Sequence, residues 1–174
     1  MYFEKEFVID KIFPIPPTLD VIFTLKEKNQ VIAIESKFSE PYYGANPGLK
    51  EKYFVDEVIS KLWNDIPSIK RIAEDICPED KKFQYLHVAQ LIKHILGLKK
   101  SYKKKDFVLL YLWYNVPGKE GYYHLKEIEF IKELFQKDGI NFKSMTYQEL
   151  IIQLAEKFRK IHYNYIKYIT ERYL

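Results

Sequence analysis

The chain has 174 residues, of which 47% are hydrophobic and 30% charged, with 28 Lys and Arg against 24 Asp and Glu. This hydrophobic share can bury a core, which excludes a disordered chain, and the length favours one domain over residues 1–174. The single cysteine, Cys77, excludes an intramolecular disulfide and a multi-cysteine zinc site. The net charge of +4 permits a polyanionic partner without demanding one.

The predicted elements begin with two strands. Residues 19–25 are rich in β-branched and aromatic side chains, and a polar turn separates them from a returning strand over residues 30–38. A loop rich in Pro, Gly and Tyr follows over residues 40–48. This order predicts an antiparallel hairpin.

Three helices are expected next, over residues 50–63, 67–76 and 81–98. In the third, apolar side chains recur with the helical period, and Gly97 is the predicted stop. Opposite its apolar stripe lie His87, Gln90 and His94, for which a solvated face is the favoured interpretation.

The rest of the chain returns to strand and helix. The apolar run 106–114 does not alternate, which is typical of a strand covered on both faces. We expect a helix over residues 122–137, a short strand over 141–145, and a final helix that starts at the capping box Thr146–Glu149. The order predicts an α/β fold with a mixed sheet and helices on both faces.

The register of the hairpin can be read from the sequence. Pairing Asp20 with Glu35 centres the turn between Glu27 and Lys28, within a polar stretch. Because side chains alternate along a strand, this register places on one face Asp20, Ile22, Thr24, Val31, Ala33, Glu35 and Lys37.

Asp20, Glu35 and Lys37 are then charged groups at one end of a sheet whose two faces are both mostly apolar and therefore expected to be covered. Buried charge is costly unless it is paired or binds a metal. Two carboxylates repel each other, and a divalent cation between them relieves that repulsion. Oxygen ligands suit Mg²⁺ or Mn²⁺, so we expect one of these ions.

At these residues the sequence resembles a known family. The stretches Pro17-Thr-Leu-Asp20 and Glu35-Ser-Lys37 are similar to the active-site signature of the PD-(D/E)XK nuclease superfamily. Residues 85–94, 110–114 and 146–150 resemble a branch of small bacterial members. The resemblance implies a restriction-endonuclease-like mixed central β-sheet flanked by α-helices. It also implies Mg²⁺-dependent hydrolysis of phosphodiester bonds in nucleic acid, with DNA as the expected substrate.

The resemblance also implies roles for single residues. Asp20 and Glu35 would hold the metal with help from a backbone carbonyl near Ser36, and Lys37 would position the attacking water and stabilise developing charge. Many members carry a polar residue on a later helix, for which Gln90 is the candidate. A further acid on a helix before the first strand is common in the family; only sixteen residues precede Pro17 here, and Glu4 and Glu6 are the candidates.

Substrate contacts are expected from two further segments. Tyr42 and Tyr43 follow the Lys37 strand, where a structural and a substrate-facing role are equally open. A lysine-rich stretch could contact phosphates, although a solvated loop is the favoured interpretation; its members are Lys99, Lys100, Lys103, Lys104 and Lys105. Trp63 and Trp113 are expected in the core.

Several alternatives stay open. The fold could serve as a catalytically inactive nucleic-acid-binding or assembly module, or as a phosphatase or nucleotidase with similar carboxylates. Apolar and tyrosine side chains spread around the end of the final helix, so a homodimer and a monomer are both open. Charge from Glu4 onward excludes a signal peptide, and the uncharged run 107–118 is too short for a membrane span. We therefore expect a cytoplasmic protein with no membrane partner.

Overall fold

The computed structural model describes residues 1–25, 27, 29–44, 46–55 and 57–174. Its centre is a five-stranded sheet with the strand order β1-β2-β3-β4-β5. The strands are β1 (Tyr2–Glu6), β2 (Thr18–Leu25), β3 (Gln30–Lys37), β4 (Phe107–Trp113) and β5 (Phe142–Thr146). β1, β2 and β3 pair antiparallel, whereas β3, β4 and β5 pair parallel. The expected mixed sheet of an α/β fold is therefore confirmed.

The β2–β3 hairpin has the predicted register, because Val21 pairs with Ile34 and Ile22 with Ala33. The predicted turn centre involves Lys28, which, like Lys26, lies outside the described residues. Ile22, Val31 and Ala33 are buried, as expected for the face that meets the core.

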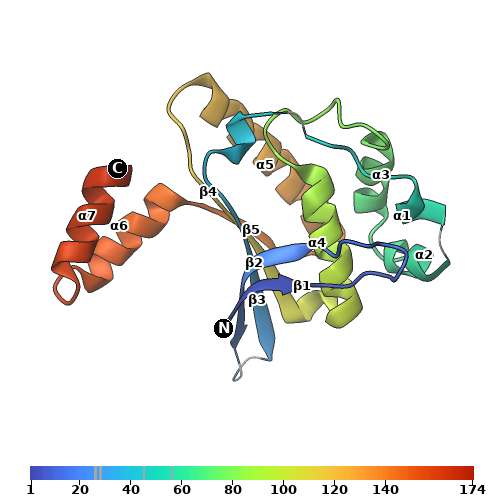
Figure 1. Cartoon of the computed structure of the whole chain (residues 1–174), viewed down its shortest axis with the longest axis horizontal. Helices are drawn as coiled ribbons and strands as arrows, with labels where there is room; N and C mark the ends of the chain where they lie inside the picture. Colours follow the sequence, from blue (N-terminus) through green and yellow to red (C-terminus); the bar gives the residue numbers. More distant parts are fainter. Residues whose placement is uncertain (26, 28, 45, 56) are drawn as a thin grey trace.

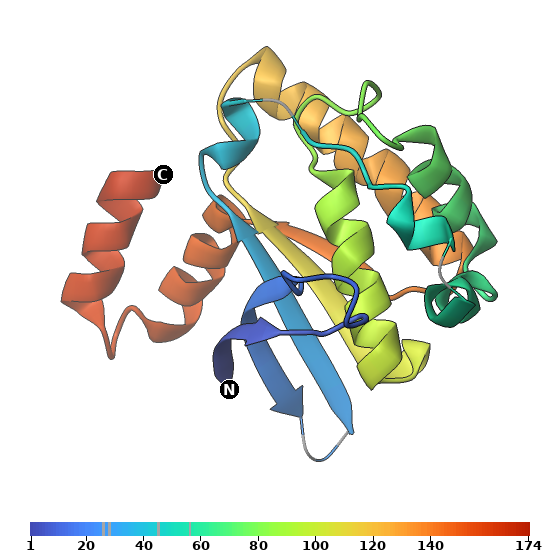
Figure 2. The same ribbon diagram turned by 45° about the vertical axis from the view of Figure 1, so that its right-hand side comes forward.

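Most helices lie on this side of the sheet. They are α1 (Lys52–Val55), α2 (Glu57–Trp63), α3 (Pro67–Asp75), α4 (Val88–Ser101) and α5 (Lys119–Lys137). α3, α4 and α5 lie on the same side of the sheet, with α4 packed along the strands (Figures 1 and 2). Trp63 and Trp113 are 3% and 2% exposed, which confirms their predicted place in the core.

The predicted third helix is wrong at both ends. It does not begin at residue 81, because backbone N–H groups of residues 84–86 donate to the Glu127 carboxylate of α5 at 2.7–2.9 Å and hold that segment as a loop. It does not stop at Gly97, because α4 continues to Ser101. A Cβ at Gly97 would lie 2.7 Å from the Cβ of Phe7, so the glycine permits close packing rather than ending the helix.

The carboxy-terminal part also differs from the single helix expected. The capping box of Thr146 and Glu149 is present and begins α6 (Tyr147–Phe158), but the chain then turns back into α7 (Tyr163–Tyr173). The turn lets Ile166 and Ile169 of α7 pack against Ile151 of α6 in a small separate apolar cluster. The two helices form an arm that projects from the sheet on the side away from α4 (Figure 1).

This arm covers only part of the second sheet face, so the expectation of two fully covered faces is wrong. Phe23 and Leu25 of β2 remain 36% and 37% exposed. The strand β1 was also missed by sequence reasoning, whose first predicted strand begins at residue 19. No helix within the described ranges is long and apolar enough to cross a membrane.

Candidate active site

Asp20, Glu35 and Lys37 meet where the β2–β3 hairpin leaves its regular pairing. The Nζ atom of Lys37 lies 2.8 Å from Oε1 of Glu35, whose side chain is 2% exposed. Beyond the Val21–Ile34 pair, Oδ2 of Asp20 accepts a hydrogen bond from the backbone N–H of Ser36 at 2.6 Å. The Asp20 carboxylate thus binds the neighbouring strand at the point where Glu35 enters the core.

The helix α4 adds two side chains to this group. Nε2 of Gln90 donates to Oε1 of Glu35 at 2.7 Å, and Nε2 of His94 lies 2.9 Å from Oε2 of the same carboxylate. Gln90 and His94 are one helical turn apart, which places them on one face of α4. One buried carboxylate therefore has neighbours from both the strand and the helix.

Part of this group lacks hydrogen-bond partners. Oε2 of Glu35 and both ring nitrogens of His94 are buried, and they have none among the residues that the structure describes. His94 and Glu35 are thus close enough for an ion pair, but they are not aligned for a hydrogen bond. Oε2 of Glu35 therefore has the His94 ring as a close neighbour but lacks the aligned hydrogen bond that buried polar atoms nearly always have.

The two carboxylates have opposite electrostatic settings. Burial opposes ionisation of Glu35, but the nearby His94 and Lys37 outweigh it and lower its pKa. Burial raises the pKa of Asp20, and the negative charge of Glu35 adds to this effect against the Ser36 hydrogen bond. A cation between the two carboxylates would relieve the repulsion that Asp20 experiences.

The residues present fit a magnesium-like ion. No group of three or more His, Cys, Asp or Glu side chains suited to a metal is found in the described ranges. Mg²⁺ is commonly held by one or two carboxylates, with water and substrate phosphate completing its shell. The Glu35 carboxylate and the Asp20 carboxylate, which is close enough to feel its charge, supply such a pair.

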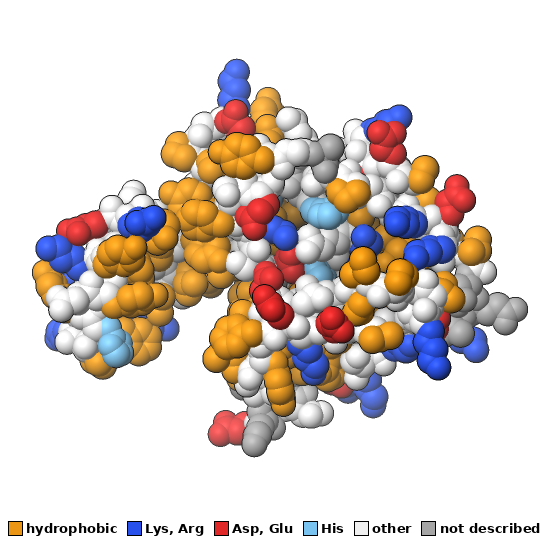
Figure 3. All heavy atoms as spheres, viewed as in Figure 1, with side chains coloured by type: hydrophobic (Ala, Val, Ile, Leu, Met, Phe, Trp, Pro, Cys, Tyr) orange, Lys and Arg blue, Asp and Glu red, His pale blue; other side chains and the backbone are white. Residues whose placement is uncertain are grey.

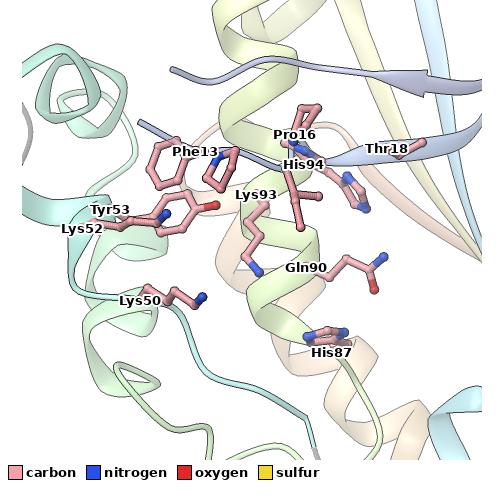
Figure 4. A pocket seen from close by; sticks show the side chains of 13 residues that line it. Phe13, Pro16, Thr18, Lys50, Lys52, Tyr53, His87, Gln90, Lys93 and His94 are labelled. Carbon is pink, nitrogen blue, oxygen red and sulfur yellow. The ribbon is translucent and has the colours of Figure 1, made fainter. Parts of the chain in front are cut away.

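A cavity of about 440 Å³ opens beside this group. Gln90 and His94 line it from α4, together with His87 at the start of the helix (Figure 4). Burial, with the charges of Lys93 and Lys37, lowers the pKa of His87 to about 4. The favoured solvated face for these α4 residues is therefore wrong: His94 is 1% exposed.

Tyr42 points inward rather than toward this cavity. Its hydroxyl donates to the Tyr114 carbonyl at 2.8 Å and lies 3.1 Å from Nδ1 of His124. Burial raises the pKa of Tyr42 to about 12. The neighbouring Tyr43 is 79% exposed, so only Tyr43 is free to meet a substrate in this arrangement.

The lysine-rich stretch is largely built into the fold, which contradicts a simple solvated loop. Lys99 pairs with Asp65, and Lys100 donates to the Ile9 carbonyl. Lys104 lies 3.0 Å from Oδ2 of Asp65 and donates to two backbone carbonyls. The exposed side chains of this stretch without a partner in the described structure are Lys103 and Lys105.

The expected upstream acids are not part of the group. Glu4 and Glu6 lie on the edge strand β1, where Glu6 pairs with Thr18. Within the described structure, no hydrogen bond or ion pair connects either acid to Asp20 or Glu35.

Comparison with known proteins gives one family. A family model described as Restriction Endonuclease associating with ARP, REase-ARP, matches residues 15–174. The match includes the whole group of Asp20, Glu35, Lys37, Gln90 and His94. No curated protein and no solved structure matches the chain.

Proposed function

The chain belongs to the REase-ARP family of restriction endonucleases, and from this premise we propose that it hydrolyses phosphodiester bonds of DNA with the help of Mg²⁺ or Mn²⁺. The observation that carries the proposal is the shared location of Asp20, Glu35 and Lys37 beside an open cavity. Buried charged groups are costly, and their replacement by well-packed apolar side chains is often neutral or stabilising, which favours a functional reason for this group.

Asp20 and Glu35 would hold the metal. When bound, such an ion polarises the scissile phosphate and lowers the pKa of its bound water. Gln90 keeps Glu35 in place through Oε1, which leaves Oε2 directed away from this bond. Asp20 is fixed in the same way, because its Oδ2 accepts from Ser36.

Lys37 would act on the water and on the phosphate. Its ammonium group has three hydrogens, and the contact with Glu35 uses one of them. The remaining two can donate to an attacking water or to a phosphate oxygen. This is the positive charge that the transition state of phosphodiester hydrolysis requires.

Contacts with the rest of the DNA would come from the surface around the site. Tyr43, Lys103 and Lys105 are exposed and can contribute, whereas Lys104 and Tyr42 would act through the fold that they support. Tyrosines on the outer side of α7 would join two copies into a dimer. The protein would act in the cytoplasm, where DNA is present and where a free cysteine such as Cys77 stays reduced.

A cleavage assay tests the proposal. Purified protein is incubated with supercoiled plasmid and with single-stranded DNA in Mg²⁺, Mn²⁺ or EDTA. We expect cleavage with either metal, none in EDTA, and loss of cleavage in Glu35→Gln. The matched control is Glu133→Gln, which removes an exposed acid of α5 and should cleave like the wild type.

A DNA-binding measurement and a small phosphate ester substrate, added to this assay, separate the alternatives. Metal-independent DNA binding without cleavage would identify an inactive binding or assembly module. Hydrolysis of small phosphate esters with no cleavage of DNA would identify a phosphatase or nucleotidase.

A further inference from the structure

The cavity beside Glu35 has a second set of charges that the proposed chemistry does not use. Lys50, Lys52 and Lys93 line it (Figure 4). Lys50 and Lys93 extend into the open space toward one another. Residues 13–17 add an apolar wall to the cavity.

The fold places these lysines in the cavity through close packing. A Cβ at Gly48 would lie 2.2 Å from the carbonyl oxygen of Ile76, so glycine is required for the chain before Lys50 to pass this close. Lys52 lies over the Phe13 ring at 4.6 Å, and Phe13 stacks on Tyr53 at 4.2 Å. These contacts fix the cavity wall next to α4.

Among the described residues, the three lysines have no acidic partner. In the part of the chain that the structure describes, no ion pair or hydrogen bond is formed by the ammonium groups of Lys50 and Lys93. Lys52 makes only a 3.5 Å contact with the Ile12 carbonyl in addition to its ring contact. Burial lowers the pKa of Lys93, and the charges of Lys50 and Lys52 lower it further.

Like charges in a partly buried cavity repel each other, and an anion would relieve that repulsion. His94, at 1% exposure, lines the same cavity, and its Nδ1 has no hydrogen-bond partner in the described structure. The volume of about 440 Å³ suits a group the size of a nucleotide.

The cavity also lies at the right place for a substrate strand. Gln90 and His94 contact Glu35 and line the cavity at the same time, so both sites share one wall. Lys93 follows Gln90 by three residues, which is about 4.5 Å along the helix axis. A strand bound at Glu35 would therefore reach Lys93 with a neighbouring phosphate.

We propose that Lys50, Lys52 and Lys93 form a subsite for a phosphate group of the substrate strand other than the scissile one, an inference that rests on the proposed function. The ligand is a phosphate ester, either an internal diester or a terminal monoester of the strand. The apolar wall of residues 13–17 would face the attached sugar or base.

Binding measured by fluorescence anisotropy tests this subsite. The probes are a single-stranded oligonucleotide with a 5′-phosphate and the same oligonucleotide with a 5′-hydroxyl, both in EDTA. The variant is Lys50→Gln with Lys93→Gln. We expect at least about tenfold weaker binding, and a salt dependence of log Kd that is shallower by about 0.7 for each lost phosphate contact.

Two controls separate binding from folding. Lys157→Gln with Lys160→Gln removes the same charge from exposed positions at the end of α6 and in the turn after it, within the arm on the other side of the sheet, and should bind nearly as the wild type does. The Lys50, Lys93 variant should unfold at the same or a higher temperature, because removing like charges relieves repulsion. If that variant is unstable, Lys50→Gln alone, at an exposed position, should still flatten the salt dependence.

The two probes distinguish the source of the phosphate. If the variant loses affinity only for the 5′-phosphorylated oligonucleotide, the subsite binds a terminal monoester. An equal loss of affinity for both oligonucleotides indicates an internal diester. Wild-type affinity and salt dependence in the folded variant would overturn the inference. If the wild-type protein binds DNA but does not cleave it with metal, the proposed function is contradicted. The subsite is still tested in that case, because binding is measured in EDTA.

Discussion

Replacement of Lys37 by alanine should separate catalysis from folding. The Lys37 ammonium group lies 2.8 Å from Glu35, and its side chain is 19% exposed. Removing one group that stabilises transition-state charge costs roughly 10²–10³-fold in turnover, or about 2.7–4 kcal/mol. We therefore expect Lys37→Ala to lose turnover on this scale at saturating DNA.

The expected loss of folding stability in Lys37→Ala is too small to account for the expected loss of turnover. A hydrogen bond to a charged group contributes about 1.5–3 kcal/mol, and Glu35 keeps its contact with Gln90 in the variant. A domain with about 5 kcal/mol of stability would retain about 2 kcal/mol, so roughly 97% of the molecules would remain folded. Unfolding can therefore not explain a hundredfold loss of turnover.

The assay combines single-turnover cleavage in Mg²⁺ with urea unfolding of the same preparation. Lys143→Ala, an exposed lysine of β5, is the matched control and should leave both quantities near the wild type. Wild-type turnover in Lys37→Ala would refute the role of Lys37. A loss of turnover no larger than the loss of folded protein would refute it as well.

Three further outcomes are expected. Burial and the charge of Glu35 raise the pKa of Asp20 above 3.8, so the favourable contribution of Asp20 to folding is present below that pH and is lost as pH rises. Asp20→Asn should therefore increase the free energy of unfolding at pH 7 in EDTA, and it should abolish cleavage. A decrease in the free energy of unfolding would contradict this. His94 and Lys37 lower the pKa of Glu35 from 4.5 despite its burial, so Glu35 stabilises the fold above that pH and loses this contribution as pH falls. Below pH 4.5, the free energy of unfolding should therefore fall less steeply with pH in Glu35→Gln than in the wild type, which urea unfolding across pH would detect. Tyr165 and Tyr168 are 62% and 56% exposed on α7; if they join two copies, Tyr165→Ser with Tyr168→Ser should reduce a dimeric mass to about 21.0 kDa in light scattering, and a monomeric wild type would end the proposal.

The exposed tyrosines show why self-association could not be decided from sequence alone. The sequence indicated apolar side chains around several sides of the last helix. The turn into α7 buries Ile166 and Ile169 against α6, but it leaves Tyr163, Tyr165 and Tyr168 more than half exposed. The arm also presents hydrophobic side chains on the face shown in Figure 3.

The strand part of the site was predictable because it depends on local rules. Alternation along each strand and a polar turn were enough to place Asp20, Glu35 and Lys37 on one face, and the pairing of Val21 with Ile34 confirms that register. The roles assigned to these residues stay predictions until activity is measured.

The helix part was less predictable because it depends on how distant segments pack. Periodicity placed Gln90 and His94 on one side of α4, but it could not show that this side faces Glu35 instead of solvent. The start of α4 depends on Glu127, which lies more than thirty residues later in the chain and holds residues 84–86 as a loop. The one available signal was the spacing of four between Gln90 and His94.

The central claim is that Asp20 and Glu35 together hold a divalent cation, and a crystal structure with Mn²⁺ tests it most directly. Anomalous scattering should show one strong peak between the two carboxylates, with metal–oxygen distances of about 2.0–2.2 Å. The same peak should be absent from crystals of Asp20→Asn grown in the same solution. An empty site in saturating Mn²⁺, or a metal bound elsewhere without either carboxylate, would contradict the account.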